Sequence, residues 1–317
     1  MRRLFDGEKK LEPTPADVEK CIGKPSTFFW LDIEAPDDAD IALLRESFHF
    51  HPLTIEDVQH QNQRPKLDNY NGYDFIVMLV AQPQGDDVSF REHHLYLGEH
   101  FVVTVHQEPE PAFDKLHDRV AEFDQDALRR PGFVAYLVMD VLVDATFDVL
   151  EALDESVDQL QDQILDEADT KQLVRLQNLK HGVTEMRRVL AAQRDMFQRL
   201  TTHSLERYDP ETTAYYRDVY DHTVRQYESV DSLRDLMTGA MDVYLSMVSN
   251  RLNSTMKALT VIASLFLPLT FFTGFFGMNF GWLVSRINGF EAFAIGLAVM
   301  VSSVAFQLIL FRRRGWL

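Results

Sequence analysis

The sequence predicts an α+β protein with a mixed α/β domain, a long helical part and a membrane hairpin at its C-terminal end. Runs rich in β-branched and aromatic residues end before residue 132. After Gly132, apolar residues recur at steps of three and four, which is typical of amphipathic helices. Residues 258–285 form a stretch of 28 residues without a charge, and residues 292–311 give 20 more. A spanning helix needs about 20 mostly apolar residues, so these segments predict two helices across a bilayer.

The α/β domain is predicted to occupy residues 1–132. Four runs are expected to be strands: residues 28–33, 73–80, 88–97 and 100–107. The pairs Gly85-Asp86 and Gly98-Glu99 supply the turns between the last three runs. Helical spacing covers residues 37–48 and 112–128, and the pair Pro131-Gly132 marks the end of the domain.

Residues 133–257 are predicted to form a helical hairpin and a stalk helix. Between Asp144 and Asp169 there are 10 acidic residues and no basic one, whereas residues 171–200 carry 7 basic and 2 acidic residues. Antiparallel helices with complementary solvated faces explain this pattern. Attraction of cations by the acidic helix is a second explanation.

The stalk helix is expected to continue into the first membrane span. It begins near Pro210 and has no internal proline until Pro268. A helix over residues 211–276 would be roughly 100 Å long at about 1.5 Å per residue. A monomer of this size does not bury such a rod, so we expect a homo-oligomer.

The membrane hairpin is predicted at residues 258–317, with spans at about 258–277 and 290–311. Two buried core helices of a soluble protein are the alternative. Arg251 and Lys257 precede the first span and three arginines, 312–314, follow the second, whereas the connection carries only Arg286. Under the positive-inside rule both termini are cytoplasmic, which predicts a multi-pass protein of the cell inner (plasma) membrane.

Composition excludes several classes of function. The formal charge of −18 argues against nucleic acid as a partner, because phosphate binding needs basic surfaces. Cys21 is the single cysteine, which indicates a reducing compartment, and residues 1–13 do not resemble a signal peptide. The sequence contains no HExxH, GxSxG, CxxC or Walker-type glycine motif, so we expect neither an enzyme nor an ATP-driven pump.

A stripe of polar and small residues follows one face of the long helix at alternating steps of three and four. In a coiled coil this seam would be apolar. Polar groups within membranes usually line cavities, so the stripe favours a water-filled pore on the axis of a helix ring. Hydrogen bonding between packed helices is the alternative. The stripe consists of Asp221, Arg225, Glu228, Ser232, Asp235, Gly239, Asp242, Ser249, Asn253, Met256, Thr260, Ala263, Leu267, Thr270 and Gly274.

The segment FFTGFFGMNFGW, residues 271–282, interrupts the first span with an amide. Mg²⁺ gives up its octahedral waters reluctantly, so a fast pore offers oxygen dipoles to the intact water shell. Asn279 side chains and Gly277 carbonyls from several chains would form a ring of such dipoles at the outer mouth, and Asn253 side chains would form a second ring. Met256 and Leu267 would narrow the lumen between them and gate it by dewetting.

These residues resemble the CorA family of divalent-cation channels. The resemblance rests on Gly-Met-Asn after the first of two C-terminal spans, on YYRDVYDH, on the run DVYLSMVSNRLNSTMKALTVIASLFLPLTFFTGFFGMNF and on the terminal RRRGWL. HPLTIEDV and QRPK match more diffusely. The family implies a homopentameric funnel and passive, voltage-driven influx of Mg²⁺, often with Co²⁺ or Ni²⁺.

The resemblance also implies residue roles. It places the outer selectivity ring at Gly277, Met278 and Asn279, a lower polar ring at Asn253, an apolar gate at Met256 and Leu259, and a mid-pore polar position at Thr270. It places a regulatory Mg²⁺ site at Asp218, with Asp86 or Asp87 of a neighbouring subunit as its partner. An ordinary ion pair of Asp218 with Arg217 or Arg225 is the alternative.

One departure from the family bears on which ion is transported. Many members carry an acid shortly after Gly-Met-Asn, whereas here the loop FGWLVSRING carries Arg286 and the first acid is Glu291. A zinc-transporting branch has a similar loop. The chain's 11 histidines, among them His49, His51, His93 and His94, lack metal-site spacing. Magnesium therefore stands first and zinc second, and a membrane-anchored sensor without transport is a third reading.

Overall fold

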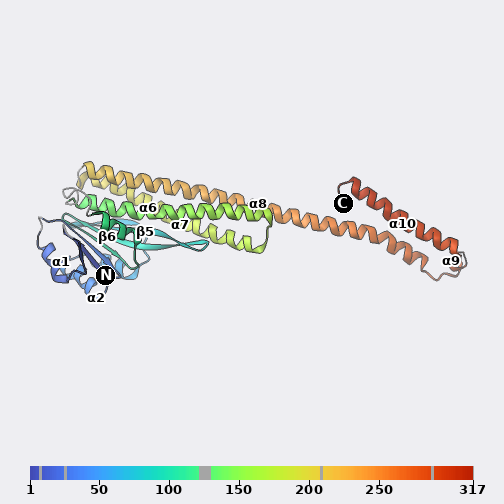
Figure 1. The fold of residues 1–317 in the computed structure, drawn as a ribbon, viewed down its shortest axis with the longest axis horizontal. Coiled ribbons are helices and arrows are strands. Elements are labelled where there is room, and N and C mark those ends of the chain that lie inside the picture. The colour runs from blue at the N-terminus through green and yellow to red at the C-terminus, as the bar shows by residue number, and fades with distance from the viewer. Residues whose placement is uncertain (7–8, 25–26, 121–129, 208–209, 287–288, 317) are drawn as a thin grey trace. The chain divides into compact units, whose positions relative to one another are not determined.

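The structure is a computed structural model and describes residues 1–6, 9–24, 27–120, 130–207, 210–286 and 289–316 (Figure 1). These residues form two compact units, one of residues 1–166 and 170–241 and one of residues 167–169 and 242–317. The first unit contains β1 (Arg2–Phe5), β2 (Lys9–Leu11), α1 (Pro15–Ile22), β3 (Phe29–Glu34), α2 (Asp38–Ala42), the π-helix η1 (Leu43–Ser47), α3 (Pro52–His60), β4 (Lys66–Tyr70), β5 (Tyr73–Gln84), β6 (Asp87–Gly98), β7 (Phe101–His106), α4 (Pro111–Val120), α6 (Pro131–Asp166) and α7 (Thr170–Arg207). Helix α8 (Pro210–Phe276) continues from the first unit into the second, which also holds α9 (Gly281–Arg286) and α10 (Phe290–Arg313).

The strands form one seven-stranded sheet in the order β2-β1-β3-β7-β6-β5-β4. All neighbouring strands are antiparallel except β3 and β7, whose register pairs Phe29 with Phe101. The strands predicted at residues 28–33, 73–80, 88–97 and 100–107 are confirmed as β3, β5, β6 and β7. Strands β1, β2 and β4 were not predicted.

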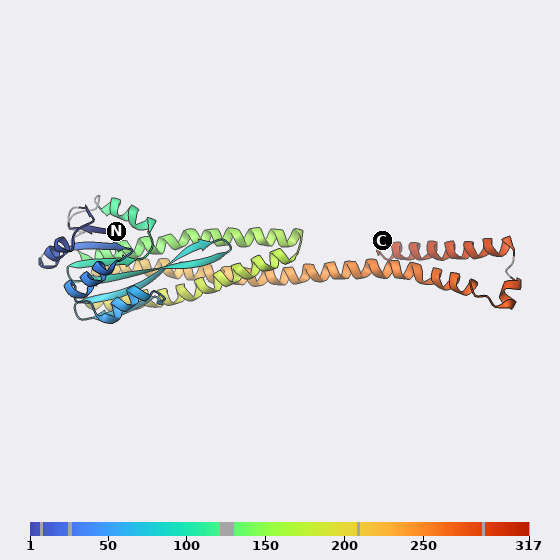
Figure 2. The ribbon, with the colours of Figure 1, turned by 90° about the horizontal axis from the view of Figure 1, so that it is seen from below.

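The sheet is the middle layer of three, because successive side chains on a strand point to opposite faces. On β3, Phe29 and Leu31 join the core under α1, α2, η1 and α3, whereas Trp30 joins the core against α4, α6 and α8. Both views show the long helices running along one face of the strands (Figure 2). The sheet and the helices of the first unit therefore share a core across residue 132. The predicted division at residues 132 and 257 rests on secondary structure and membrane location, and it stays a prediction.

The predicted helices are confirmed with small shifts in their ends. The helix expected at residues 37–48 is present as α2 followed by η1, because one turn of the helix is wound more widely. The helix expected at residues 112–128 begins at Pro111 and is described to Val120, and residues 121–129 lie outside the described part of the chain. Helix α8 passes through Pro268 without ending.

A buried polar network lies inside the sheet domain. Asp32 is 1% exposed, and its carboxylate accepts a hydrogen bond from Thr104 Oγ1 at 2.6 Å. Its two oxygens also lie 3.2 Å from His106 Nε2 and 3.2 Å from His117 Nε2. Burial opposes ionisation, but the two imidazoles outweigh it and hold the pKa of Asp32 well below its ordinary value. The network satisfies a charge that would otherwise be costly inside the core.

Candidate ion pathway and cation site

Helix α8 ends at the predicted Gly-Met-Asn motif. The backbone N–H of Gly277 donates to the carbonyl of Thr273 at 2.9 Å, and that of Met278 to Phe275 at 3.3 Å, so the chain tightens into a turn. A Cβ at position 277 would lie 2.9 Å from the Thr273 carbonyl oxygen, closer than real side chains approach. The turn therefore requires glycine. Asn279 is exposed, and its amide has no hydrogen-bond partner among the described residues.

The predicted polar stripe is exposed along its whole length in the single chain. Every residue from Asp221 to Gly274 on this stripe is exposed, including Asn253, Thr260 and Thr270. The residues that α8 buries in the first unit lie on a different face, with Val219, Gln226 and Leu233 among them. The stripe is therefore free to face water or other copies of the chain.

Two threonine hydroxyls on the stripe are oriented by the helix that carries them. Thr260 Oγ1 donates to the Met256 carbonyl at 2.8 Å, and Thr270 Oγ1 donates to the Phe266 carbonyl at 2.9 Å. Because each hydroxyl hydrogen is used within the helix, the remaining lone pairs act as acceptors outward. The waters around a cation donate hydrogen bonds outward, so acceptors of this kind match a hydrated ion.

Large apolar side chains alternate with the polar groups on this part of α8. Met256, Leu259 and Leu267 are 64%, 64% and 75% exposed. Apolar surface of this extent is unfavourable in water. These side chains therefore require lipid or neighbouring chains to cover them, and the same holds for α10, which has no buried residue.

The second unit brings basic residues to one end of the helical hairpin. Both α8, over its last turns, and α10 are long and apolar enough to cross a membrane. Lys257 Nζ donates to the carbonyl of Gly315 at 2.7 Å, and Trp316 stacks on Phe311 with ring centroids 5.8 Å apart. Lys257 and the arginines at 312–314 thus lie at the same end, as the predicted orientation requires.

At the opposite end, Arg286 lies over the ring of Trp282 at 5.9 Å. This places a fixed positive charge on α9, shortly after the Gly-Met-Asn motif. Such a charge lowers the local concentration of cations.

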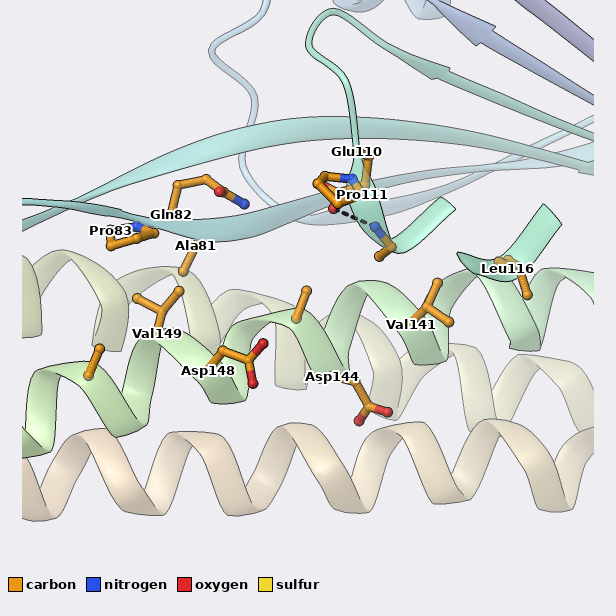
Figure 3. A pocket seen from close by; sticks show the side chains of 13 residues that line it. Ala81, Gln82, Pro83, Glu110, Pro111, Leu116, Val141, Asp144, Asp148 and Val149 are labelled. Atoms are coloured by element: carbon orange, nitrogen blue, oxygen red, sulfur yellow. Dashed lines mark hydrogen bonds between the residues drawn. The ribbon is translucent and has the colours of Figure 1, made fainter. Parts of the chain in front are cut away.

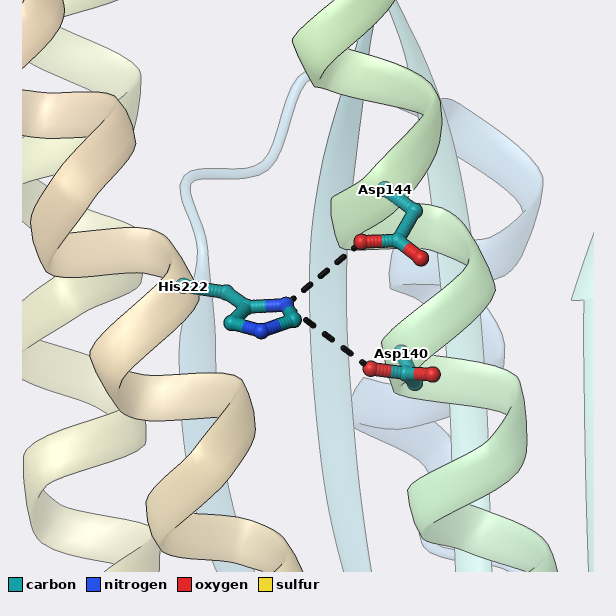
Figure 4. A group of neighbouring side chains, drawn as sticks. All are labelled: Asp140, Asp144 and His222. Carbon is teal, nitrogen blue, oxygen red and sulfur yellow. Dashed lines mark ion pairs between the residues drawn. The ribbon is translucent and has the colours of Figure 1, made fainter.

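A second candidate site lies in the first unit, between α6 and α8 (Figure 4). Asp140, Asp144 and His222 offer ligand atoms within 4.8 Å of one another. His222 Nδ1 lies 3.5 Å from Asp144 Oδ1 and 4.0 Å from Asp140 Oδ1. Carboxylate and imidazole groups in this arrangement can hold a divalent cation.

The predicted regulatory residue Asp218 belongs to the same surroundings. Its Oδ1 atom lies 3.8 Å from His222 Nε2, one helical turn away on α8. Burial, followed by the charges of Asp140 and Asp218, raises the pKa of Tyr136 to about 12. The contributions of Asp140 and Asp218 have the sign expected for negative charges near the phenol.

The other two predicted regulatory residues lie elsewhere in the chain. Asp86 pairs with Arg175 at 2.9 Å, and an oxygen of Asp87 lies 3.3 Å from His181 Nδ1, so both hold the β5–β6 turn against α7. The structure does not bring them to Asp218 within one chain. Their predicted meeting across a subunit boundary stays a prediction.

Sequence reasoning missed Asp140, Asp144 and His222. Both pairs, Asp140 with Asp144 and Asp218 with His222, are spaced at i and i+4, which places each pair on one helix face. That spacing was visible in the sequence. The packing of α6 against α8 was not, and it is what brings the two pairs together.

Comparison with known proteins agrees with this architecture. The family model described as "CorA-like Mg2+ transporter protein" matches residues 25–313. The cobalt/magnesium transport protein CorA of Thermotoga maritima is 32% identical over 308 residues, covering 95% of this chain and 87% of the relative. The zinc transport protein ZntB of an Enterobacter species is 28% identical over 225 residues, covering 70% of this chain and 67% of the relative.

A solved structure shares the fold over the whole length. The CorA magnesium transporter of Methanocaldococcus jannaschii superposes with a TM-score of 0.82 at 21% identity, covering 100% of this chain and 99% of the other. The likeness confirms the predicted α+β fold with its long helix and C-terminal helical pair. The chain belongs to the CorA-like Mg²⁺ transporter family.

Proposed function

We propose that the chain transports hydrated divalent cations across a membrane, with Mg²⁺ as the main ion and Co²⁺ and Ni²⁺ as further substrates. The observation that carries the proposal is the continuous exposed stripe on α8 that leads to the Gly277-Met278-Asn279 turn. Family membership and the names of the relatives support the ion class. The protein is a transporter rather than an enzyme in this proposal.

The pathway requires a homo-oligomer, and the family resemblance makes it a pentamer. In this assembly the stripes of neighbouring first spans face one another around a wet axis. Asn279 and the Gly277 carbonyl hold the water shell of the ion at the outer mouth, and Thr270, Thr260 and Asn253 pass it inward as hydrogen-bond acceptors. Met256, Leu259 and Leu267 form the apolar constriction that closes the path.

The driving force is the membrane potential. A divalent cation gains about 4.6 kcal/mol per 100 mV of inside-negative potential, which is twice the value for one charge. The proposed setting is the cell inner membrane, with both termini in the cytoplasm. The basic end formed by Lys257 and residues 312–314 supports this orientation.

Regulation by cytosolic Mg²⁺ is part of the proposal. Asp218 lies beside a carboxylate and histidine group that can hold a cation. A cation there, together with Asp86 or Asp87 of a neighbouring subunit, would neutralise like charges and favour the closed assembly. Loss of the ion would favour opening.

Zinc is the alternative ion. The observation that favours it is Arg286, which stacks on Trp282 after the motif where many members have an acid. A similarity to a zinc transport protein over 225 residues supports the same alternative. Magnesium stays first because similarity to a cobalt/magnesium transport protein extends over 308 residues.

Uptake into liposomes tests the proposal. The purified protein is reconstituted with an entrapped magnesium-sensitive dye, and an inside-negative potential is applied. We expect voltage-dependent uptake that falls by at least about tenfold in Asn279→Ala, because the substitution removes an amide from every subunit of the mouth.

The matched control is Asn250→Ala, an exposed asparagine on α8 that is not on the stripe. It should transport as the unmodified protein does. No uptake by the unmodified protein, or equal uptake with Asn279→Ala, would refute the proposal. The same assay with a zinc dye decides between the two ions.

A further inference from the structure

The acidic character of the chain belongs to its first unit. The cavity where the end of β5 and the start of α4 face α6 is an example, because three carboxylates and no lysine, arginine or histidine are among the described residues that line it (Figure 3). In the second unit, residues 242–317 carry six basic and two acidic residues, although the whole chain has a formal charge of −18. Four of the six, Lys257 and the arginines at 312–314, lie at one end of the helical hairpin and attract anions there.

The C-terminal end of α10 is a well-formed turn. Gly315 has a φ of +66°, the left-handed conformation that commonly ends helices, and its N–H donates to the Arg312 carbonyl at 3.2 Å. The N–H of Trp316 donates to the Phe311 carbonyl at 2.9 Å, and the two rings stack. These two hydrogen bonds and the ring contact are the elements of a Schellman motif. The backbone that carries the three arginines is therefore held in place.

Lys257 joins this turn to the first span. Its Nζ atom donates to the Gly315 carbonyl at 2.7 Å, across 58 residues of sequence. An ammonium group has three N–H donors, so two remain for another acceptor. Arg314 directly precedes Gly315, so its backbone belongs to the same turn. A lysine of α8 and an arginine at the end of α10 are thus brought to one place.

No carboxylate neutralises these cations among the described residues, which end at Trp316. Neither Lys257 nor any of the arginines at 312–314 forms an ion pair there, whereas Arg251, six residues before Lys257, pairs with Glu167 at 3.6 Å. After Asp242 the single acidic residue is Glu291, in the first turn of α10 and so at the other end of that helix. An anionic group can therefore bind without displacing a carboxylate of the described residues.

The surroundings of these cations suit a lipid rather than a free phosphate ion. Over the last turns of α10, Phe306, Ile309 and Leu310 are 67%, 58% and 37% exposed, and Trp316 is 40% exposed. Acidic lipids place negative charge at the cytoplasmic membrane surface, with their acyl chains directly beneath it. Tryptophan is enriched at this level of membranes. Cations beside exposed apolar side chains match a headgroup and its acyl chains together.

We propose that Lys257, Arg314 and the turn at Gly315 bind one acidic phospholipid of the cytoplasmic leaflet. The Lys257 ammonium and the Arg314 guanidinium bind the phosphate, and the acyl chains lie along α10. The arginines at 312 and 313 strengthen the local positive potential. Such a lipid bridges the two spans of one chain. The inference rests on the proposed membrane orientation, but it does not depend on transport.

Native mass spectrometry of the purified, delipidated protein tests the proposal. The probes are phosphatidylglycerol and phosphatidylcholine with the same acyl chains. We expect one phosphatidylglycerol per chain, bound at least about tenfold more tightly than phosphatidylcholine, whose choline cation cancels the phosphate charge. Lys257→Gln and Arg314→Gln should each weaken phosphatidylglycerol binding about fivefold, the effect typical of one basic residue at a membrane surface.

Two further variants separate a structured site from general attraction to positive charge. Gly315→Val keeps every charge but is strained in the left-handed turn, so it should weaken binding about fivefold. Arg251→Gln removes a cation of α8 that Glu167 already pairs, and it should bind as the unmodified protein does. Thermal melting checks that each variant is folded.

Four results would overturn the proposal: equal binding of the two lipids, equal weakening by Arg251→Gln, unchanged binding by Gly315→Val, or displacement of the lipid by excess inorganic phosphate. The last result would indicate a site for free anions. Ion uptake into liposomes of phosphatidylcholine alone is measured separately, so failure of lipid binding and failure of transport are distinguishable.

Discussion

The two halves of α8 differ in what they bury, although they belong to one helix. From Thr212 to Ala240, all within the first unit, the helix carries a stripe of buried residues at steps of three and four. After Tyr244 the only buried residue of α8 is Val261. Contacts within the same chain therefore hold the first half in place, whereas the second half leaves both its apolar and its polar faces uncovered.

This difference indicates which surfaces of α8 other molecules must cover. Lipid can cover the apolar face of the second half, but hydroxyl and amide groups facing hydrocarbon are costly. The polar stripe is better placed on a water-filled axis formed by several chains. The same sequence feature, a repeat of three and four, thus builds a core in one half and a proposed ion pathway in the other.

The largest effect expected from this comparison is on stability. Leu233 is 3% exposed in the first half and Leu259 is 64% exposed in the second. Leu233→Ala should lower the free energy of unfolding by about 2–5 kcal/mol, because it leaves a cavity in the core. Leu259→Ala should cost far less in detergent. Thermal melting of both variants checks this, and equal melting temperatures would contradict the distinction.

The next effect concerns the pH dependence of stability. Residues 258–285, in the second half, have no group that titrates, so a pH dependence of unfolding must come from other parts of the chain. The pKa of Asp32 is depressed in the folded protein. Its contribution to stability is therefore present above its unfolded pKa of 3.8 and is lost as the pH falls below that value.

Asp32→Asn should destabilise the protein by about 3 kcal/mol near pH 6, since it breaks a buried charged network. The difference in melting temperature between the variant and the unmodified protein should be constant above about pH 4 and should narrow progressively as the pH falls below 3.8 toward the depressed pKa of Asp32. A difference that stays constant over this range would show that the carboxylate charge does not contribute.

A smaller effect is expected within the second half. Thr270→Val keeps the shape of the side chain and removes its outward acceptor, so liposome uptake should fall about fivefold, the equivalent of about 1 kcal/mol for one hydrogen bond. Thr255 makes the same hydroxyl contact to its own helix but lies opposite the stripe. Thr255→Val should leave uptake unchanged, and equal losses would exclude a special role for the stripe.

The smallest effect concerns regulation from the first half. His222→Ala removes one candidate ligand and should raise the Mg²⁺ concentration needed for protection from proteolysis by about threefold, since two carboxylates of the group remain. His60→Ala, which alters an exposed histidine at the end of α3, is the control. An unchanged midpoint for His222→Ala would remove this group from the regulatory site.

Much of the fold was predictable because local pattern and tertiary packing agree. The central strands β3, β5, β6 and β7 are apolar runs of strand length, and the long helices keep one period over many turns. Strands β1 and β4 were missed because Arg2, Arg3, Lys66 and Asp68 make them polar, and their pairing with β3 and β5 supplies the stability that the sequence does not display.

The candidate site was predictable only where it lies on one element. The stripe on α8 and the turn at Gly277 follow from periodicity and a single motif. The group of Asp140, Asp144 and His222 depends on two helices that are distant in sequence. No local pattern specifies how such elements pack.

The most direct test of the proposed pathway is the reactivity of cysteines placed on α8. Cys21 is the only cysteine, so Cys21→Ser gives a background without thiols. Asn253→Cys, Thr260→Cys and Thr270→Cys should react with a charged, membrane-impermeant methanethiosulfonate and lose ion uptake, whereas Ile262→Cys, on the opposite face, should not react. Unreactive cysteines on the stripe, or equal reaction at position 262, would contradict a water-filled path along this face.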